Sequence, residues 1–160
     1  MAHPPGIYSA ILGSIANPLQ PEGQWLPWVD GQEATLTEGA QGGFHIWMKL
    51  RIGGAGPGRE LEMQKMAHRV SDDRLVLRAM QTIQVGPEGA EGFWEMPVAT
   101  PMFMCPSPIG ISVIDEAILF ELIFTDATNV EVARAGIKVV PRCPTTSADS
   151  LMFCKRICTG

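Results

Sequence analysis

The stretch that decides the fold class is Phe44–Ile52, which reads FHIWMKLRI. In an extended chain, successive side chains point to opposite faces, so this alternation predicts an amphipathic strand. One face would carry Phe44, Ile46, Met48, Leu50 and Ile52, and the other would carry His45, Trp47, Lys49 and Arg51. The run Gly53–Gly58 (GGAGPG) cannot continue a strand and predicts a loop after it.

Similar segments lie on both sides of this strand. Residues 61–70 and 75–85 are expected to be extended on either side of a turn at 71–73, with Leu75, Leu77, Ala79, Ile83 and Val85 pointing inward. Residues 117–125 are almost continuously apolar, which indicates a strand buried on both faces or mostly so, and a hairpin turn at 126–129 leads into a strand at 130–140. Shorter strands are expected at 24–29, 33–37, 93–96 and 111–114, and no long segment has a clean helical period.

Seven to nine short strands with Gly- and Pro-rich turns predict an all-β fold, and an immunoglobulin-like antiparallel β-sandwich is favoured. Trp47 in an early strand fits that architecture, although no cysteine precedes it as in true immunoglobulin domains. We expect an N-terminal extension at 1–21, the sandwich at 22–141 and a cysteine-containing C-terminal tail at 142–160.

Composition limits the classes of function. The 160 residues are 46% hydrophobic and 18% charged, which fits one globular domain rather than a disordered chain. Twelve basic against seventeen acidic residues give a net charge of −5, without a basic cluster, so we expect no nucleic-acid partner. No apolar run reaches the length that spans a bilayer, so no membrane span is expected.

Four cysteines bear on the compartment: Cys105, Cys143, Cys154 and Cys158. Disulfides to the body of the domain would order a tail with little apolar content, and four cysteines allow three pairings. This cysteine usage predicts an extracytoplasmic protein, whether periplasmic, at the cell surface or secreted. The apolar run 7–16 lacks the basic segment of a secretory signal, so a cytosolic protein is the alternative. A zinc site is disfavoured, because only Cys154 and Cys158 lie close together in the sequence.

Two stretches carry a resemblance to a known group: Trp28–Gly31 (WVDG) and Gly39–Met48 (GAQGGFHIWM). The pattern Gly-Gly-x-His-x-Trp at the start of a strand resembles uncharacterised bacterial secreted or lipoprotein β-sandwich domains, which often carry cysteines near the end. The resemblance covers about 30 residues. It implies a secreted β-sandwich and implies no activity.

Catalytic motifs are absent from the sequence: it has no Gly-x-Ser-x-Gly, no His-Glu-x-x-His and no phosphate-binding loop. The most informative polar residue is His45, which shares a strand face with Trp47 and follows two glycines that would let another backbone approach. The imidazole could contact a ligand or metal. Alternatively, it could bond a loop carbonyl and hold the strand entrance in place.

Tryptophans supply the other binding candidates. Trp25, Trp28 and Trp94 lie in Pro- and Gly-rich contexts, where exposed rings would mark an interface and buried rings would plug the open ends of the sandwich. We favour burial. The candidate binding residues are therefore His45, Trp47, Trp28 and Trp94.

Methionines allow one metal hypothesis. Soft ligands at Met66, His68, Met102 and Met104, with His45 as an additional ligand, would select Cu(I). Met63 would point away from Met66 and His68 on a regular strand, which favours methionine as core filler. Aspartates at the proposed turns fit turn formation better than Ca²⁺ binding.

Together these features predict a non-enzymatic extracytoplasmic binding or structural module without a cofactor. Its expected partner is another protein or a second copy of the chain, because edge strands can pair between chains. The alternative hypothesis is a periplasmic copper-binding protein that uses the methionine and histidine ligands.

Overall fold

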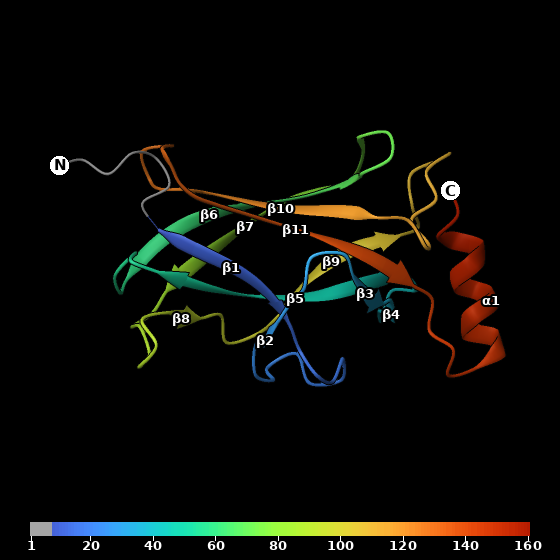
Figure 1. Cartoon of the computed structure of the whole chain (residues 1–160), viewed down its shortest axis with the longest axis horizontal. Coiled ribbons are helices and arrows are strands. Elements are labelled where there is room, and N and C mark those ends of the chain that lie inside the picture. Colours follow the sequence, from blue (N-terminus) through green and yellow to red (C-terminus); the bar gives the residue numbers. More distant parts are fainter. Residues whose placement is uncertain (1–7) are drawn as a thin grey trace.

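The computed structural model describes residues 8–160, which form eleven strands and one helix (Figure 1). Two sheets pack face to face, and the helix lies at one end of them. The predicted all-β sandwich is confirmed. The strand count exceeds the expected seven to nine because β2 (Leu26–Pro27), β4 (Thr37–Glu38) and β8 (Trp94–Glu95) are each only two residues long.

The six-stranded sheet is built around β5 (Phe44–Gly53), the strand that the alternation predicts. Four strands pair with it in antiparallel register: β1 (Ser9–Ser14), β4, β8 and β9 (Thr100–Cys105). β2 pairs with the far side of β1. Residues 9–14, which the sequence analysis placed in the N-terminal extension, therefore contribute a strand to this sheet.

The five-stranded sheet has the order β3 (Gln32–Thr35), β11 (Glu131–Arg142), β10 (Ile118–Thr125), β6 (Arg59–Arg69) and β7 (Arg74–Val85). Its pairs are antiparallel except β3 with β11, which run parallel with Gln32 opposite Val139. The sandwich is thus mixed at one edge. Immunoglobulin-like connectivity stays a prediction.

The core lies between the two sheets. The face of β5 that carries Phe44 and its apolar neighbours is buried, as the alternation predicts. On β10, Phe120 and the other residues of its face are buried, whereas the opposite face is only half-buried. The strand is therefore mostly buried, which is the weaker form of the prediction, and full burial on both faces is not reached because no second layer among residues 8–160 covers the outside of this sheet.

Two further predictions fail for local reasons. Leu75 is 43% exposed instead of pointing inward. Val76 is an extra residue opposite Ala67 and His68, and this bulge reverses the alternation at the start of β7. Residues 111–114 form no strand; instead, the amide of Val113 donates to the carbonyl of Cys158 and so joins this loop to the tail.

The C-terminal tail contains a helix, α1 (Ala148–Ile157), which the sequence analysis did not predict. It begins at the cap residue Ser147, whose hydroxyl accepts from the amide of Ser150 at 3.1 Å. Asp149 lies in its first turn and two basic residues lie in its last, which suits the helix dipole. A short capped helix with few apolar residues gives little periodic signal.

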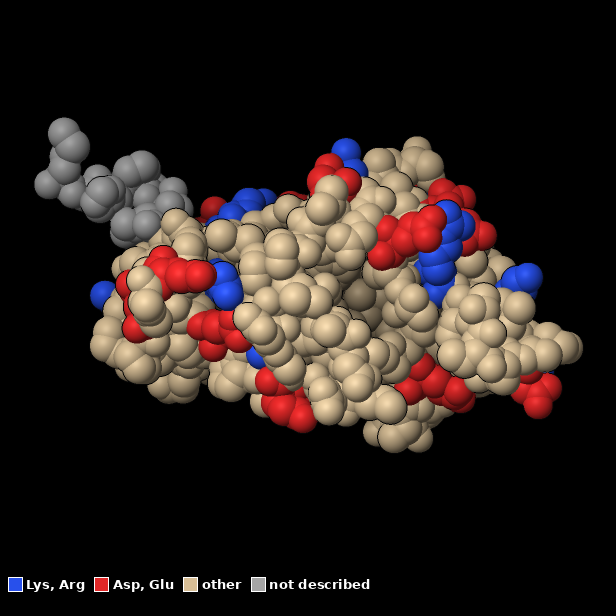
Figure 2. Space-filling view, turned by 60° about the horizontal axis from the view of Figure 1, so that its bottom comes forward, with Lys and Arg blue, Asp and Glu red and all other residues tan. Residues whose placement is uncertain are grey.

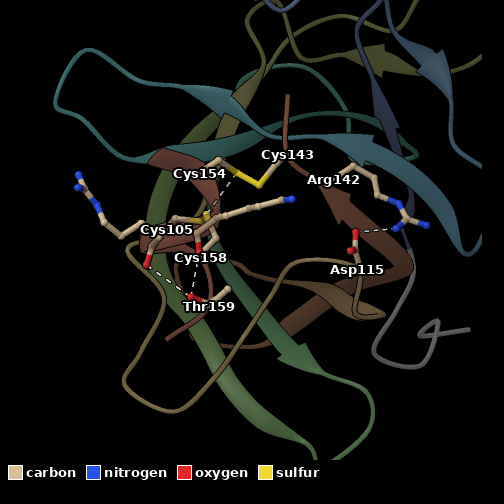
Figure 3. Close-up of a disulfide and its surroundings, with 9 residues drawn as sticks. Cys105, Asp115, Arg142, Cys143, Cys154, Cys158 and Thr159 are labelled. Atoms are coloured by element: carbon tan, nitrogen blue, oxygen red, sulfur yellow. Dashed lines mark hydrogen bonds and ion pairs between the residues drawn. A yellow bond between two sulfur atoms is a disulfide. The ribbon is translucent and has the colours of Figure 1, made fainter. Parts of the chain in front are cut away.

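Disulfides fasten α1 to the sandwich, as the cysteine content predicts (Figure 3). Cys105 pairs with Cys158 and ties the helix to β9, while Cys143 pairs with Cys154 across the loop that precedes the helix. The ring of Phe153 packs on Phe44, with centroids 5.7 Å apart. No helix within residues 8–160 is long and apolar enough to cross a membrane.

Candidate functional site

The outer face of the six-stranded sheet is crossed by residues 15–24, in the segment between β1 and β2, which we call the strap. Three hydrogen bonds hold it there: Trp47 Nε1 donates to the carbonyl of Pro18 at 3.0 Å, Lys49 Nζ donates to that of Gly23, and the amide of Ala99 donates to that of Pro21 at 2.7 Å. The strap therefore covers the middle of β5.

Charged side chains beneath one end of the strap pair with each other. Lys49 is 2% exposed, and its ammonium lies 3.5 Å from Glu95, which also accepts from Arg51 at 3.2 Å. The guanidinium of Arg51 lies 4.2 Å from the ring centroid of Trp25. Arg51 also pairs with Glu91 at 3.0 Å, so two cations face two carboxylates, and these residues have a structural role.

Beyond the other end of the strap, the sheet opens into a groove of about 710 Å³, which we call the His45 groove. Its floor and walls come from His45 and Trp47 of β5, Pro101 and Phe103 of β9, Leu19 of the strap and residues 37–43. Figure 2 shows one face of the molecule, where uncharged side chains cover most of the middle and acidic and basic side chains lie in small groups around it. Phe103 is 55% exposed and presents its ring to solvent.

His45 is the central polar group of this groove. It is 6% exposed, and neither ring nitrogen has a hydrogen-bond partner among the described residues. Its ring stands edge-on to Trp47 and Phe103, at centroid distances of 4.4 and 5.9 Å. The bond from the ring to a loop carbonyl, which was the structural alternative in the sequence analysis, is not made.

Burial lowers the pKa of His45 below its ordinary value of 6.5, because the charged imidazolium loses solvation. The ring is therefore neutral at physiological pH. A neutral imidazole offers one N–H donor and one nitrogen acceptor. His45 thus holds an unused donor and an unused acceptor between two aromatic rings, but both nitrogens are buried beneath the groove, so a ligand reaches them only when a neighbouring segment such as the loop 38–43 moves.

The glycines before β5 have the close-approach role that the sequence predicts. A Cβ atom on Gly43 would lie 2.5 Å from the carbonyl oxygen of Cys105 in β9. Gly42 has a φ of +84°, which disfavours other residues. These two positions let the loop 38–43 turn tightly over the start of β5 and form the rim of the groove.

Charge in the groove is sparse. Among its lining residues, Glu38 is the acidic one, and none is Lys or Arg. A phosphate or carboxylate ligand would therefore meet no cation there. The lining suits a ligand that is uncharged or weakly cationic.

A smaller cavity of about 310 Å³ lies on the other side of Trp47. The two spaces share Pro18, Thr37 and Trp47 as walls. Trp28 lines this cavity, is mostly buried and packs edge-on against Phe120 at 5.9 Å. Its indole N–H has no partner in the described part of the chain.

The remaining tryptophan candidates have packing roles. Trp25 is buried and its ring lies against Gly13, where a Cβ atom would approach the indole nitrogen to 2.2 Å. Trp94 is half-buried on β8 beside Gly86. Of the four predicted binding residues, the structure brings His45 and Trp47 together in the groove, whereas Trp28 and Trp94 lie outside it.

The copper ligand set is not assembled. Met102 and Met104 point into the core between the sheets, while Met66 and His68 lie half-buried on β6. Met63 is buried and points away from Met66, as the sequence predicts. Within residues 8–160, no three His, Cys, Asp or Glu side chains are grouped so as to hold a metal ion.

The sequence analysis missed Phe103 and Leu19 as walls of the groove. A signal for Phe103 exists in the segment Thr100–Cys105, because its alternation with Met102 and Met104 places it on the opposite face. Leu19 lies in an irregular loop, where no periodicity predicts direction. Comparison of the chain with protein-family models gives no match, and comparison with curated proteins gives no significant match.

Proposed function

We propose that this chain is a non-enzymatic, extracytoplasmic binding module whose His45 groove holds an uncharged, extended segment of a partner protein. The observation that carries the proposal is His45, which lines an open groove and whose two ring nitrogens are buried without a partner among residues 8–160, so that a ligand bonds them once the rim loop 38–43 moves aside. Buried polar groups in proteins are normally hydrogen-bonded, so a ligand that bonds this ring gains from an unused site.

Peptide chemistry matches the groove in three respects. A peptide unit supplies both a carbonyl acceptor and an N–H donor, which are the two partners that a neutral imidazole needs. Exposed Phe103 and Leu19 offer apolar contact to a side chain of the bound segment. The absence of Lys and Arg from the lining disfavours an acidic segment.

The extracytoplasmic setting is supported by the two disulfides, which persist in oxidising compartments and are rare in the cytosol. They are structural in position, since they hold α1 on the sandwich next to the groove. Without them the tail would have few apolar contacts, so a reducing compartment would leave this end of the domain weakly held.

The test is an unbiased selection of displayed twelve-residue peptides on the immobilised protein, followed by calorimetric titration of the enriched peptides. We expect enrichment of uncharged peptides with aromatic or aliphatic residues, and at least a tenfold loss of affinity in Phe103→Ser. Met80→Ser is the matched control, because Met80 is 56% exposed on the other sheet. Equal binding by both variants, or no enrichment, overturns the proposal.

A second copy of the chain is the competing occupant. Sedimentation of the wild type and of Phe103→Ser across a range of concentrations separates the two cases. Self-association that Phe103→Ser abolishes assigns the groove to a second copy. A monomer that binds the selected peptides supports a partner protein.

A further inference from the structure

The two disulfides lie against each other inside the C-terminal region (Figure 3). Cys154 Sγ and Cys158 Sγ belong to different disulfides, yet they are 3.8 Å apart. Cys154 and Cys158 are fully buried, whereas Cys143 is only half-buried. Cys105, at the far end of the chain of four sulfurs, lines the His45 groove.

We infer that the four cysteines form a thiol–disulfide exchange relay, in which a dithiol that attacks Cys143 releases a thiol at Cys105 in the wall of the His45 groove. The inference does not rest on the proposed function of the groove. In this relay the dithiol attacks Cys143, the exchange passes through Cys154 and Cys158, and Cys105 becomes the free thiol that can be modified.

In the first step, a thiolate of the dithiol attacks Cys143 Sγ, because this residue is the most exposed of the four cysteines. A mixed disulfide forms at Cys143, the bond from Cys143 to Cys154 breaks, and Cys154 leaves as a thiolate. This thiolate is buried in apolar surroundings, where its charge is poorly solvated, so it persists only briefly before it takes up a proton or attacks a neighbouring disulfide.

In the second step, the Cys154 thiolate attacks Cys158 Sγ, its neighbour at 3.8 Å. A disulfide forms between Cys154 and Cys158, the bond from Cys158 to Cys105 breaks, and Cys105 leaves as the thiolate. Residues four apart on a helix have Cα atoms about 6 Å apart, within the range that disulfides bridge, but their Cβ atoms are about 5–6 Å apart, so the last turn must tighten for the bond to close. Cys158 is the C-cap of α1, so the last turn can adjust to the new bond.

The second thiol of the dithiol then attacks the mixed disulfide and frees Cys143. Two electrons pass from the dithiol, which becomes a cyclic disulfide, to the protein, which changes from two disulfides to one. The two protons of the dithiol end on Cys105 and Cys143. Cys105 lines the groove but is itself only 4% exposed, so the net reduction by the dithiol, rather than solvation of the released thiolate, drives the exchange forward.

The relay also changes how α1 is held. The Cys105–Cys158 disulfide is the covalent link from the helix to β9, and the relay replaces it with a bond inside the helix. A limited dose of dithiol therefore frees the tail from the groove and presents Cys105 for alkylation or mixed-disulfide formation.

The test is limited reduction of the oxidised protein with dithiothreitol, followed by alkylation and digestion with trypsin. Cleavage after Lys155 and Arg156 separates Cys154 from Cys158, so a disulfide to Cys158 joins two peptides, and fragmentation of the peptide 143–155 shows which of Cys143 and Cys154 carries the label. In the species with two alkylated cysteines, we expect the label on Cys105 and Cys143, and a disulfide that joins residues 143–155 to residues 157–160. Label on Cys143 and Cys154, label on Cys105 and Cys158, or no such species, overturns the relay.

The double variant Cys143→Ala/Cys154→Ala provides an independent test. Without Cys154, the buried Cys105–Cys158 disulfide loses its internal attacker, and we expect dithiothreitol to open it at least tenfold more slowly than in the wild type. Simple loosening of the tail in this variant would have the opposite effect, because it would expose that disulfide. An equal or faster rate overturns the relay.

Discussion

The imidazole of His45 stands edge-on to the indole of Trp47, with ring centroids 4.4 Å apart and planes 79° apart. Trp47 is itself held by the bond from its Nε1 to the carbonyl of Pro18 in the strap. The strap therefore fixes the indole, and the indole fixes one side of the buried imidazole. This arrangement leaves both ring nitrogens of His45 buried and without a partner among the described residues.

The first prediction concerns the pH dependence of stability. Burial lowers the pKa of His45, so the unfolded chain binds a proton at a pH where the folded chain does not. As pH falls below about 6.5, the unfolded state is favoured, and the free energy of unfolding decreases until the folded pKa is reached. Urea unfolding at about pH 7.5 and about pH 5.5 should show this loss in the wild type, in excess of that in His45→Gln.

The variant His45→Gln also identifies which imidazole signal belongs to His45. Proton NMR of the imidazole signals should show one histidine with a midpoint below 6.5 that is missing in His45→Gln. A wild-type His45 that titrates at or above 6.5 contradicts the burial argument. An identical pH dependence of unfolding in the wild type and in His45→Gln also contradicts the burial argument.

The second prediction concerns the rim of the groove. In Gly43→Ala the new Cβ would meet the carbonyl oxygen of Cys105 at 2.5 Å, so the backbone of β9 or β5 must shift. Overpacking of this kind costs about 1–3 kcal/mol in the free energy of unfolding. Gly39→Ala is the matched control, because its nearest heavy atom, His45 Nδ1, would be at an ordinary 3.5 Å.

Chemical denaturation of the two variants separates steric strain from a general effect of losing glycine. We expect Gly43→Ala to be clearly less stable than Gly39→Ala. Equal stability of the two would mean that the close approach of β9 to the loop is absent in solution.

The alternation of apolar and polar residues predicts much of this fold, because a strand with one apolar face buries that face by turning it toward the other sheet. β5 and β6 fall where the pattern places them, and the hairpin between β10 and β11 has Asn129 at a φ of +61° in its turn. The predictions that fail do so because of local irregularities that the alternation does not show. Val76 adds a bulge, and a local insertion of that kind has no signature in a period of two.

The site was partly predictable for the same reason. Alternation places His45 and Trp47 on the outer face of β5, and the glycines indicate a close backbone. However, alternation does not say what covers that face. The strap covers Lys49 and leaves His45 at its edge, and this depends on long-range bonds such as that from Lys49 to Gly23. Disulfide pairing likewise depends on where α1 packs, which four cysteine positions alone do not determine.

The third prediction concerns a buried lysine between the sheets. Lys65 is 6% exposed, and its ammonium is held by Thr100 Oγ1 at 2.9 Å and the carbonyl of Pro101 at 3.1 Å rather than by a carboxylate. Burial lowers its pKa. Thr100→Val removes one acceptor from the ammonium and also the donor to Gln81, so the free energy of unfolding should fall by about 1–3 kcal/mol.

Thr100→Ser keeps the hydroxyl and tests whether hydrogen bonding or shape is responsible. We expect Thr100→Ser to retain most of the wild-type stability in a urea titration. If Thr100→Val were as stable as Thr100→Ser, the hydroxyl would contribute nothing to holding the buried ammonium.

The last prediction concerns the strap. Trp47→Phe keeps an aromatic ring against His45 but removes the donor to Pro18, which is one of three bonds that hold the strap on the sheet. Loss of one such bond favours local opening by about 0.5–1.5 kcal/mol, or roughly 2- to 10-fold. The amide of Ala99 reports on opening directly, because it donates to the carbonyl of Pro21 in the strap. Its hydrogen exchange should accelerate by that factor, while amides of the β6–β10 ladder such as Met63 exchange as before. Unchanged exchange at Ala99 would show that the other two bonds suffice to hold the strap, whereas equal acceleration at Met63 would show that the variant loosens the whole sandwich.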